Sequence, residues 1–204
     1  MQILIATGNK HKLSELSRLL PVSLPSGERI TYKGLADFNL TLPEETGFTL
    51  AQNAQQKALY AAQQSGLLAL SDDTGLEVDV LQGAPGVHTA RYAGNACDSH
   101  ANNEKLLRAL AGVPIFQRSA RFVTVACLAW PNGKTQLFEG ICPGHIATNY
   151  HGTNGFGYDP LFMVDELGKC FAELTADEKN AVSHRGRAFS KVRDFLRAGC
   201  QFPA

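Results

Sequence analysis

Stretches with the periodicity of β-strands and of α-helices alternate along the first part of this chain, and the alternation restricts its possible folds. Residues 2–6 are a short apolar run typical of a buried strand, and leucines recur at helical spacing between Leu13 and Leu20. An Ala- and Gln-rich stretch at residues 50–64 predicts a second helix, which Gly66 would end. This order favours an α/β or mixed-sheet fold.

The second half of the chain adds a hairpin and further helices. A strand is predicted over residues 121–130, and the Pro-Asn-Gly sequence at 131–133 predicts a hairpin turn into a second strand. Residues 98–111 predict an amphipathic helix, and a capping box at 175–178 opens another. The buried face of the last helix is expected to consist of Ala188, Phe189, Val192, Phe195 and Leu196. Since no repeat or low-complexity tract divides the chain, residues 1–204 are expected to form a single domain, whose length allows two lobes.

The charge balance and the cysteines exclude several classes of function. Lys and Arg together number 19, as do Asp and Glu, so no overall field attracts nucleic acid or an anionic membrane, and any anion must be bound locally. No apolar segment approaches the roughly 20 residues that span a bilayer. The five cysteines lack CxxC spacing and no secretory signal pattern is present, which predicts reduced thiols and a cytoplasmic location.

The stretch LLALSDDTGLEVD, residues 67–79, places two adjacent carboxylates, Asp72 and Asp73, at the end of an apolar run. One interpretation is a turn, because short polar side chains bond the local backbone and Gly tolerates positive φ. The other interpretation is that both carboxylates face positive charge. The remaining polar clusters distinguish the two.

A basic segment connects the first predicted strand to the first predicted helix. It consists of Thr7, Gly8, Asn9, Lys10, His11 and Lys12. At such a junction the backbone N–H groups and the helix dipole favour an anion, and the lysines and the histidine add positive charge. The spacing is not that of a Walker P-loop, and a solvated strand-to-helix turn is the alternative.

Glu44 and Glu45 precede the second predicted helix. Their negative charges either stabilise the N-terminus of this helix through its dipole or supply a further carboxylate to the aspartate pair. Several carboxylates around one point require a cation, and hard oxygen ligands near phosphate indicate Mg²⁺ rather than zinc. On the same helix Asn53 and Lys57 share a face. Since lysines are mostly exposed, Lys57 is predicted to lie on the surface, and binding of a phosphate is the alternative.

Two further clusters lie near the C-terminal end of the sequence. The segment at 152–160, GTNGFGYDP, combines glycines with two aromatic rings and an acid. A loop that stacks on a planar ring would use both aromatics, whereas the alternative is a glycine-rich turn with two core aromatics. Lys179 and the pair His184-Arg185 supply hydrogen-bond donors for a carbonyl or a phosphate, unless they lie at an exposed helix junction. Groups that would bind phosphate, a metal ion and a planar base together predict a nucleotide ligand whose phosphates carry the metal.

These motifs make the chain similar to the inosine/xanthosine triphosphate pyrophosphatase family, the Ham1-like enzymes that act on non-standard purine nucleotides. The motifs that carry the resemblance are TGNKHK at 7–12, EETG at 44–47, SDDTGLEVDVLQGAPG at 71–86, ARYAG at 90–94, GTNGFGYDP at 152–160 and ELTADEKNAVSHRGRA at 173–188. They occur in the family's order and cover nearly the whole chain. Residues 21–43 and 95–118 carry no such motif.

The resemblance implies hydrolysis of ITP, dITP and XTP to the monophosphate and pyrophosphate, with Mg²⁺ as cofactor. It further implies a homodimer with no nucleic-acid or membrane partner. The fold that it implies is α/β, with a mixed, elongated central sheet, flanking helices and two lobes around a nucleotide-binding cleft.

The resemblance also implies roles for individual residues. Asp73 would be the proton acceptor, and Glu45 with Asp73 would hold the metal. Asp72 would be either a direct ligand or a group that orients Asp73. The substrate would be bound by Thr7, Gly8, Asn9, Lys10, His11, Lys12, Thr74, Phe156, Gly157, Tyr158, Asp159, Lys179, His184 and Arg185. His184 and Arg185 would donate to the 6-keto group that distinguishes hypoxanthine and xanthine from adenine.

Two other functions remain open on the sequence alone. A Maf-like pyrophosphatase would act on other nucleotides, and the FGYDP and SHRG motifs argue against it. A nucleotide-binding regulator would bind a purine triphosphate without hydrolysing it. The presence of Lys12, Glu45 and Asp73 disfavours the regulator, because a protein that only binds needs no carboxylate to activate water.

Overall fold

The computed structural model describes residues 1–200, which divide into two compact units. Unit 1 consists of Met1–Asp73, Thr124–Gly140 and the residues from Arg185 onward, and unit 2 consists of Thr74–Val123 and Ile141–His184. Each unit has a hydrophobic core of its own. That all 204 residues act as one domain stays a prediction.

Unit 1 is built on parallel strands. β1 (Gln2–Ile5) pairs in parallel with β2 (Thr31–Gly34) and with the first part of β3 (Leu68–Val78). Parts of β5 (Ser119–Ala129) and β6 (Thr135–Ile146) also belong to this unit. The turn between them is closed by the N–H of Gly133, which donates to the carbonyl of Trp130 over 3.0 Å. The predicted hairpin is confirmed.

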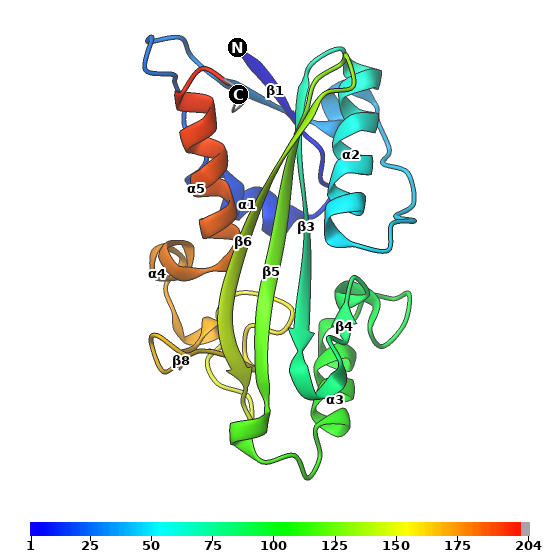
Figure 1. Cartoon of the computed structure of the whole chain (residues 1–204), viewed down its shortest axis with the longest axis vertical. Coiled ribbons are helices and arrows are strands. Elements are labelled where there is room, and N and C mark those ends of the chain that lie inside the picture. The colour runs from blue at the N-terminus through cyan, green and yellow to red at the C-terminus, as the bar shows by residue number, and fades with distance from the viewer. Residues whose placement is uncertain (201–204) are drawn as a thin grey trace. The chain divides into compact units, whose positions relative to one another are not determined.

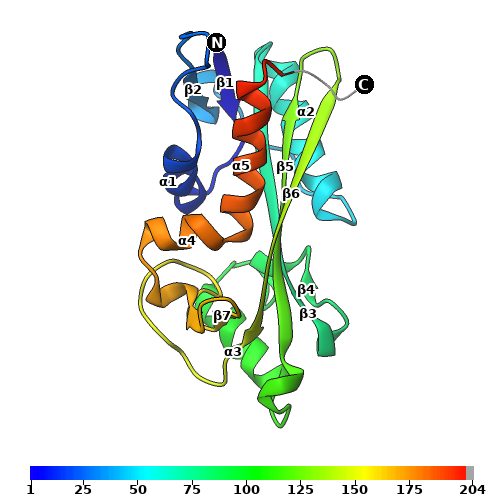
Figure 2. The same ribbon diagram turned by 60° about the vertical axis from the view of Figure 1, so that its left-hand side comes forward.

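Three helices cover the strands of unit 1. α1 (Lys10–Leu19) and α5 (His184–Arg197) lie on one face, and α2 (Leu50–Ser65) lies on the other (Figure 1, Figure 2). The face toward α1 and α5 forms an apolar cluster that contains Ile3, Ile5, Leu16, Leu70, Phe189, Val192 and Leu196. The predicted apolar face of the last helix is therefore confirmed.

The ends of α2 follow from its sequence. Thr49 accepts a hydrogen bond from the backbone N–H of Gln52, and the Gln52 side chain bonds the backbone of Thr49 in return. At the other end Gly66 takes the left-handed conformation at φ 70°, which glycine adopts without steric cost. The helix predicted from Leu50 onward, with its stop at Gly66, is confirmed.

Unit 2 surrounds a second apolar cluster. Its elements are the remaining parts of β3, β5 and β6, together with β4 (Pro85–Gly86), β7 (Phe162–Val164), β8 (Lys169–Cys170), α3 (Ser99–Ala109) and α4 (Ala176–Val182). The largest fully buried side chains of the cluster are Leu76, Leu106, Leu110, Ile146, Leu161, Phe162 and Phe171. The predicted capping box is present, because Thr175 and Glu178 bond each other's backbone N–H groups at the start of α4.

The strands are joined in the order β2-β1-β3-β5-β6-β7-β8, and β4 pairs with β3. β1 pairs in parallel with both neighbours, whereas β4, β7 and β8 pair antiparallel with theirs. The mixed α/β class predicted from the sequence is confirmed. Short 3-10 helices span Leu35–Phe38, Asp79–Leu81, Thr89–Arg91, Ile115–Gln117 and Phe171–Glu173.

Two local expectations differ from the structure. Of the two interpretations of the aspartate pair, the turn is excluded, because β3 runs through Asp72, Asp73 and Thr74 without interruption. Of the leucines that recur at helical spacing between Leu13 and Leu20, Leu16 and Leu20 are buried as expected, whereas Leu13 is 37% exposed. In both cases the local residue chemistry is compatible with more than one structure, and tertiary packing selects one.

Residues 1–200 contain no helix that is both long and apolar enough to cross a membrane. Cys127, Cys142 and Cys170 are buried, Cys97 is exposed, and no disulfide joins the cysteines in this described part of the chain.

Candidate functional site

The two adjacent aspartates point to opposite faces of β3. Successive side chains of a strand alternate between the faces of its sheet, so neighbours in sequence do not share surroundings. Asp72 lies on the face of Leu70, toward α1 and α5. Asp73 lies on the face of Ser71, whose hydroxyl donates to the carbonyl of Ala54 in α2. The repulsion expected between adjacent carboxylates is thus reduced, because each side chain meets its own cations.

Asp72 is the centre of a buried ion-pair network in unit 1. Its Oδ2 lies 3.0 Å from Lys12 Nζ and 3.3 Å from Arg185 Nε, and Arg185 also pairs with Glu15. Burial alone would raise the pKa of Asp72, but the charges of Lys12 and Arg185 outweigh burial and hold this pKa well below its ordinary value of 3.8. Two carboxylates and two cations balance in charge, so this network does not require a further cation.

Asp73 and Glu45 converge on one ammonium group. Lys57 Nζ lies 2.6 Å from Glu45 Oε1 and 2.9 Å from Asp73 Oδ1. The amide of Asn53 donates to Asp73 Oδ2 over 3.2 Å. Burial raises the pKa of Asp73, and the nearby charge of Glu45 adds to the rise, against the attraction of Lys57 and Lys12. Two carboxylates share one lysine here, so the cluster keeps a net negative charge.

Lys57 is buried, so its predicted position on the surface is wrong. Its side chain is 8% exposed and points from α2 toward β3. Burial alone would lower the pKa of Lys57, but Asp73 and Glu45 outweigh burial and raise it above its ordinary value of 10.5. A lysine is buried at low cost only when its charge is paired. The partners of Lys57 are 12 and 16 residues away in the sequence, so neighbouring residues alone do not predict the pairing.

Asn53 connects the EETG segment to β3. Its side-chain oxygen accepts a hydrogen bond from the backbone N–H of Gly47 over 2.8 Å, while its amide donates to Asp73. An added Cβ at Gly47 would lie 2.5 Å from this oxygen, so the close approach requires glycine. Asn53 and Lys57, one turn apart on α2, together hold Glu45 and Asp73 in position.

The basic segment at residues 7–12 forms the start of α1. Asn9 is the N-cap, and its side-chain oxygen accepts from the backbone N–H groups of His11 and Lys12. Gly8, Asn9, Lys10 and His11 are exposed, whereas Thr7 and Lys12 are half-buried. Of the two lysines, Lys12 alone joins the carboxylates, through Asp72. The Asn9 cap bonds two of the backbone donors that were expected to hold phosphate.

The residues predicted to hold magnesium are suited to it. Mg²⁺ is usually bound by one or two carboxylates together with water and substrate phosphates. Glu45 and Asp73 supply two carboxylates that already converge on a single cation, and the Glu45 side chain is 28% exposed. No group of three or more His, Cys, Asp or Glu side chains that could hold a metal occurs in residues 1–200, so no all-protein cage competes with this pair. Asp72 belongs to the other network, where its partners are Lys12 and Arg185, and a role for it at the metal stays a prediction.

The glycine-rich segment of unit 2 is held by Asp159. Its Oδ2 accepts from Lys179 Nζ over 2.7 Å and from the backbone N–H of Phe156 over 2.8 Å. Gly155 has a φ of 77°, and an added Cβ there would collide with this carboxylate. Lys179 Nζ also lies 4.9 Å from the centre of the half-buried Phe156 ring. Phe156, Asp159 and Lys179 are therefore brought together as the sequence predicts.

The interpretation of Tyr158 as a stacking surface does not fit its position. Its ring belongs to the core of unit 2 and is 3% exposed, and its hydroxyl donates to the carbonyl of Thr89 over 3.0 Å. The alternative of a core aromatic applies to Tyr158. Phe156 remains as an aromatic side chain that a ligand can contact.

Replacement of Tyr158 by Phe is expected to lower the free energy of unfolding by about 0.5–1.5 kcal/mol, the net contribution of one hydrogen bond. Denaturant unfolding measures the change. Tyr150→Phe is the matched control, because its hydroxyl bonds Glu104 at an exposed position and should contribute less. An equal or larger loss at Tyr150 would contradict the structural role of the Tyr158 hydroxyl.

His184 and Arg185 do not act as a pair in this structure. His184 belongs to unit 2, where its ring is 3% exposed and stacks on Phe122 with 4.5 Å between ring centres. Arg185 belongs to unit 1, where its guanidinium is bound to Asp72 and Glu15. The guanidinium of Arg185 is thus already paired with two carboxylates, and its donation to the base stays a prediction. Thr74, the first residue of unit 2, is half-buried in β3.

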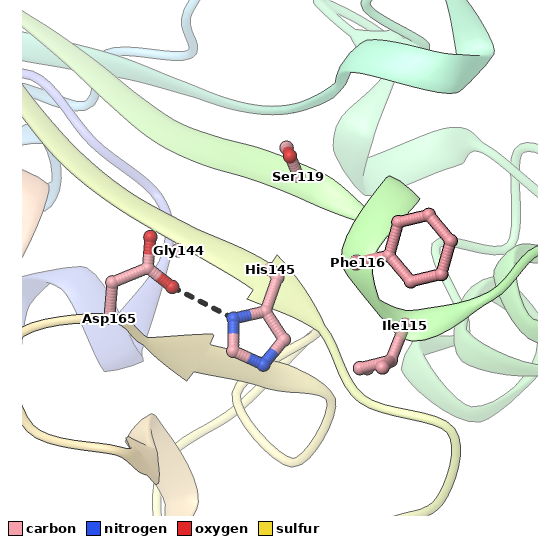
Figure 3. A pocket seen from close by; sticks show the side chains of 6 residues that line it. All are labelled: Ile115, Phe116, Ser119, Gly144, His145 and Asp165. Carbon is pink, nitrogen blue, oxygen red and sulfur yellow. Dashed lines mark hydrogen bonds and ion pairs between the residues drawn. The ribbon is translucent and has the colours of Figure 1, made fainter.

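Unit 2 also contains a small pocket of about 220 Å³ (Figure 3). It is lined by Ile115, Phe116, Ser119, Gly144, His145 and Asp165. His145 Nδ1 lies 2.8 Å from Asp165 Oδ1. None of the residues predicted to bind substrate or metal lines this pocket, so it is separate from the candidate site.

Two members of these networks, Glu15 and Phe122, are not predicted from the sequence. Glu15 pairs with Arg185 across 170 residues, and Phe122 stacks on His184. A signal existed for Glu15 alone, because it lies three residues after Lys12 on one helix face, the spacing of a helical ion pair. For Phe122 no local signal exists, since an aromatic residue in a strand is most often a core residue.

The fold and the site define a mixed α/β protein in which two carboxylates, Glu45 and Asp73, converge on the ammonium of Lys57. The model of the Ham1 family matches residues 3–195, and the chain belongs to this family. The dITP/XTP pyrophosphatase of Elusimicrobium minutum is 56% identical over 193 residues, which cover 94% of this chain and 98% of the relative. That of Desulforamulus reducens is 49% identical, with 96% of each chain covered.

Solved structures agree with this assignment. A HAM1 protein from Coxiella burnetii superposes with a TM-score of 0.87 at 38% identity and covers 97% of this chain and 99% of its own. The Ham1 protein of Staphylococcus aureus superposes with a TM-score of 0.85 at 36% identity, and the match covers 98% of this chain and 100% of that protein.

Proposed function

We propose that this protein hydrolyses the non-standard purine nucleoside triphosphates dITP, ITP and XTP to the nucleoside monophosphate and pyrophosphate. The observation that carries the proposal is the convergence of Glu45 and Asp73 on one cation, beside the basic start of α1. Relatives that share 44–56% of their residues with this chain are named dITP/XTP pyrophosphatases, which supports the same substrate class. The enzyme would remove these nucleotides from the nucleotide pool.

In the proposed reaction Asp73 accepts a proton from water. The water oxygen forms a bond to the α-phosphorus, and the bond from this phosphorus to the oxygen that bridges to the β-phosphate breaks. Pyrophosphate leaves with the bonding electrons. Asn53 fixes the orientation of Asp73 through Oδ2, and the raised pKa of Asp73 makes it a better base than an exposed aspartate.

Binding of the phosphates is proposed for Lys12 and the start of α1, where the helix dipole favours negative charge. Glu45 and Asp73 would hold Mg²⁺, which when bound neutralises charge on the phosphates. In unit 2 Phe156, with its backbone N–H fixed by Asp159, would contact the base. His184 remains the proposed donor to the 6-keto group.

A homodimer and a cytoplasmic location are also proposed. Both follow from the family resemblance, and the absence of disulfides among the described cysteines supports a reducing compartment. Size-exclusion chromatography with light scattering measures the oligomeric state.

Pyrophosphate release from dITP, XTP, dATP and dGTP, with and without Mg²⁺, tests the proposed function. We expect release that depends on the metal and favours dITP and XTP over dATP, because a keto group accepts the hydrogen bond that the adenine amine cannot. Tight binding of dITP without release would instead support a regulator. Preference for pyrimidine nucleotides would support a Maf-like enzyme.

A further inference from the structure

Lys57 stands between the two carboxylates that would hold the metal. Its Nζ contacts Glu45 Oε1 at 2.6 Å and Asp73 Oδ1 at 2.9 Å, distances typical of strong charge-assisted hydrogen bonds. The second oxygen of Asp73 accepts from Asn53. Both oxygens of Asp73 therefore already have a donor from the protein itself.

A divalent cation at this pair would share its ligands with a positive charge. A metal that binds Glu45 and Asp73 at ordinary distances would lie a few ångströms from the ammonium of Lys57, where like charges repel strongly in a poorly solvated site. The Lys57 side chain is 8% exposed and that of Asp73 is 10% exposed, so water screens the repulsion poorly. The ammonium and the metal thus compete for the same oxygens.

We infer that Lys57 is a resident counterion that keeps Glu45 and Asp73 close together in the metal-free protein and weakens their affinity for free divalent cations. The inference rests on the proposed function for the identity of the metal site, and it adds a role for a residue outside that proposed ligand set. Without Lys57 the two carboxylates would repel each other and attract a divalent cation more strongly. With Lys57 the metal binds best together with phosphates, because they offer the ammonium an alternative anion.

The test is the binding of Mn²⁺ alone, measured by titration calorimetry on the nucleotide-free protein. We expect Lys57→Met to bind Mn²⁺ at least ~10-fold more tightly than the wild type, since one competing charge is removed. Lys57→Arg is the matched control, because it keeps the charge and should stay within ~3-fold of the wild type. Adding Glu45→Gln to Lys57→Met should abolish the gain, which locates the bound metal at this pair. Unchanged or weaker binding by Lys57→Met would overturn the inference.

Stability gives a second readout in case Lys57→Met folds poorly. Without its counterion the carboxylate pair should destabilise the variant in chelator, and Mn²⁺ should raise its melting temperature more than that of the wild type. A variant that Mn²⁺ stabilises no more than the wild type would overturn the inference. Neither measurement uses turnover, so a failure of the proposed hydrolysis would not be mistaken for a failure here.

Discussion

Replacement of Asp73 by Asn is expected to lower the rate of pyrophosphate release from dITP by about 10² to 10⁴-fold, the usual contribution of a general base. The amide has the size of the carboxylate but cannot accept a proton from water. The change also removes one of the two carboxylates that pair with Lys57, so that Glu45 alone remains of the pair. It therefore weakens the proposed metal site. Steady-state kinetics at saturating Mg²⁺ measure the loss, which should lie mainly in kcat.

Asp165→Asn is the matched control for this experiment. Asp165 is an aspartate of unit 2 that is 55% exposed and pairs with His145 at the small pocket, which none of the proposed catalytic groups lines. The same change of carboxylate to amide should leave turnover near the wild-type value. If Asp73→Asn kept more than about a tenth of wild-type turnover, a loss far below that of a general base, Asp73 would not be the proton acceptor.

The elements of the fold were predictable where the pattern is local. The alanine-rich composition and Gly66 define α2, the Pro-Asn-Gly turn defines the β5–β6 hairpin, and the Thr175 capping box defines the start of α4. Each depends on residues within a few positions of one another, so secondary-structure preference and packing agree.

The motifs predict several residues of the candidate site, but they do not predict which side chains form ion pairs with one another. The motifs identify Lys12, Glu45 and Asp73, yet the burial of Lys57 and the pairing of Arg185 with Asp72 depend on contacts between segments far apart in the sequence. The aspartate pair shows the limit most clearly. Its residues are compatible with a turn locally, whereas in the structure β3 continues through them and each carboxylate pairs with a cation on its own face of the strand.

Replacement of Asp72 by Asn is expected to lower the free energy of unfolding by about 3–5 kcal/mol, because it removes one partner from a buried ion-pair network. Asp72 is 1% exposed and Arg185 is 2% exposed, so the remaining cations cannot regain their charge balance from water. Denaturant unfolding at neutral pH measures the loss. Asp79→Asn is the control, since its side chain is 58% exposed and lies 3.8 Å from Arg121. Such a surface pair should change stability by no more than about 1 kcal/mol.

The same variant has a predictable dependence on pH. Because Lys12 and Arg185 hold the pKa of Asp72 below its ordinary value of 3.8, folding favours the ionised form. The stabilisation is therefore fully present above the ordinary pKa and is lost as the pH falls below it toward the folded-state pKa. The difference between the wild type and Asp72→Asn should be constant from pH 5 to 7 and should shrink below about pH 4. A difference of equal size at pH 3 and pH 7 would mean that shape, and not the charge of Asp72, stabilises this network.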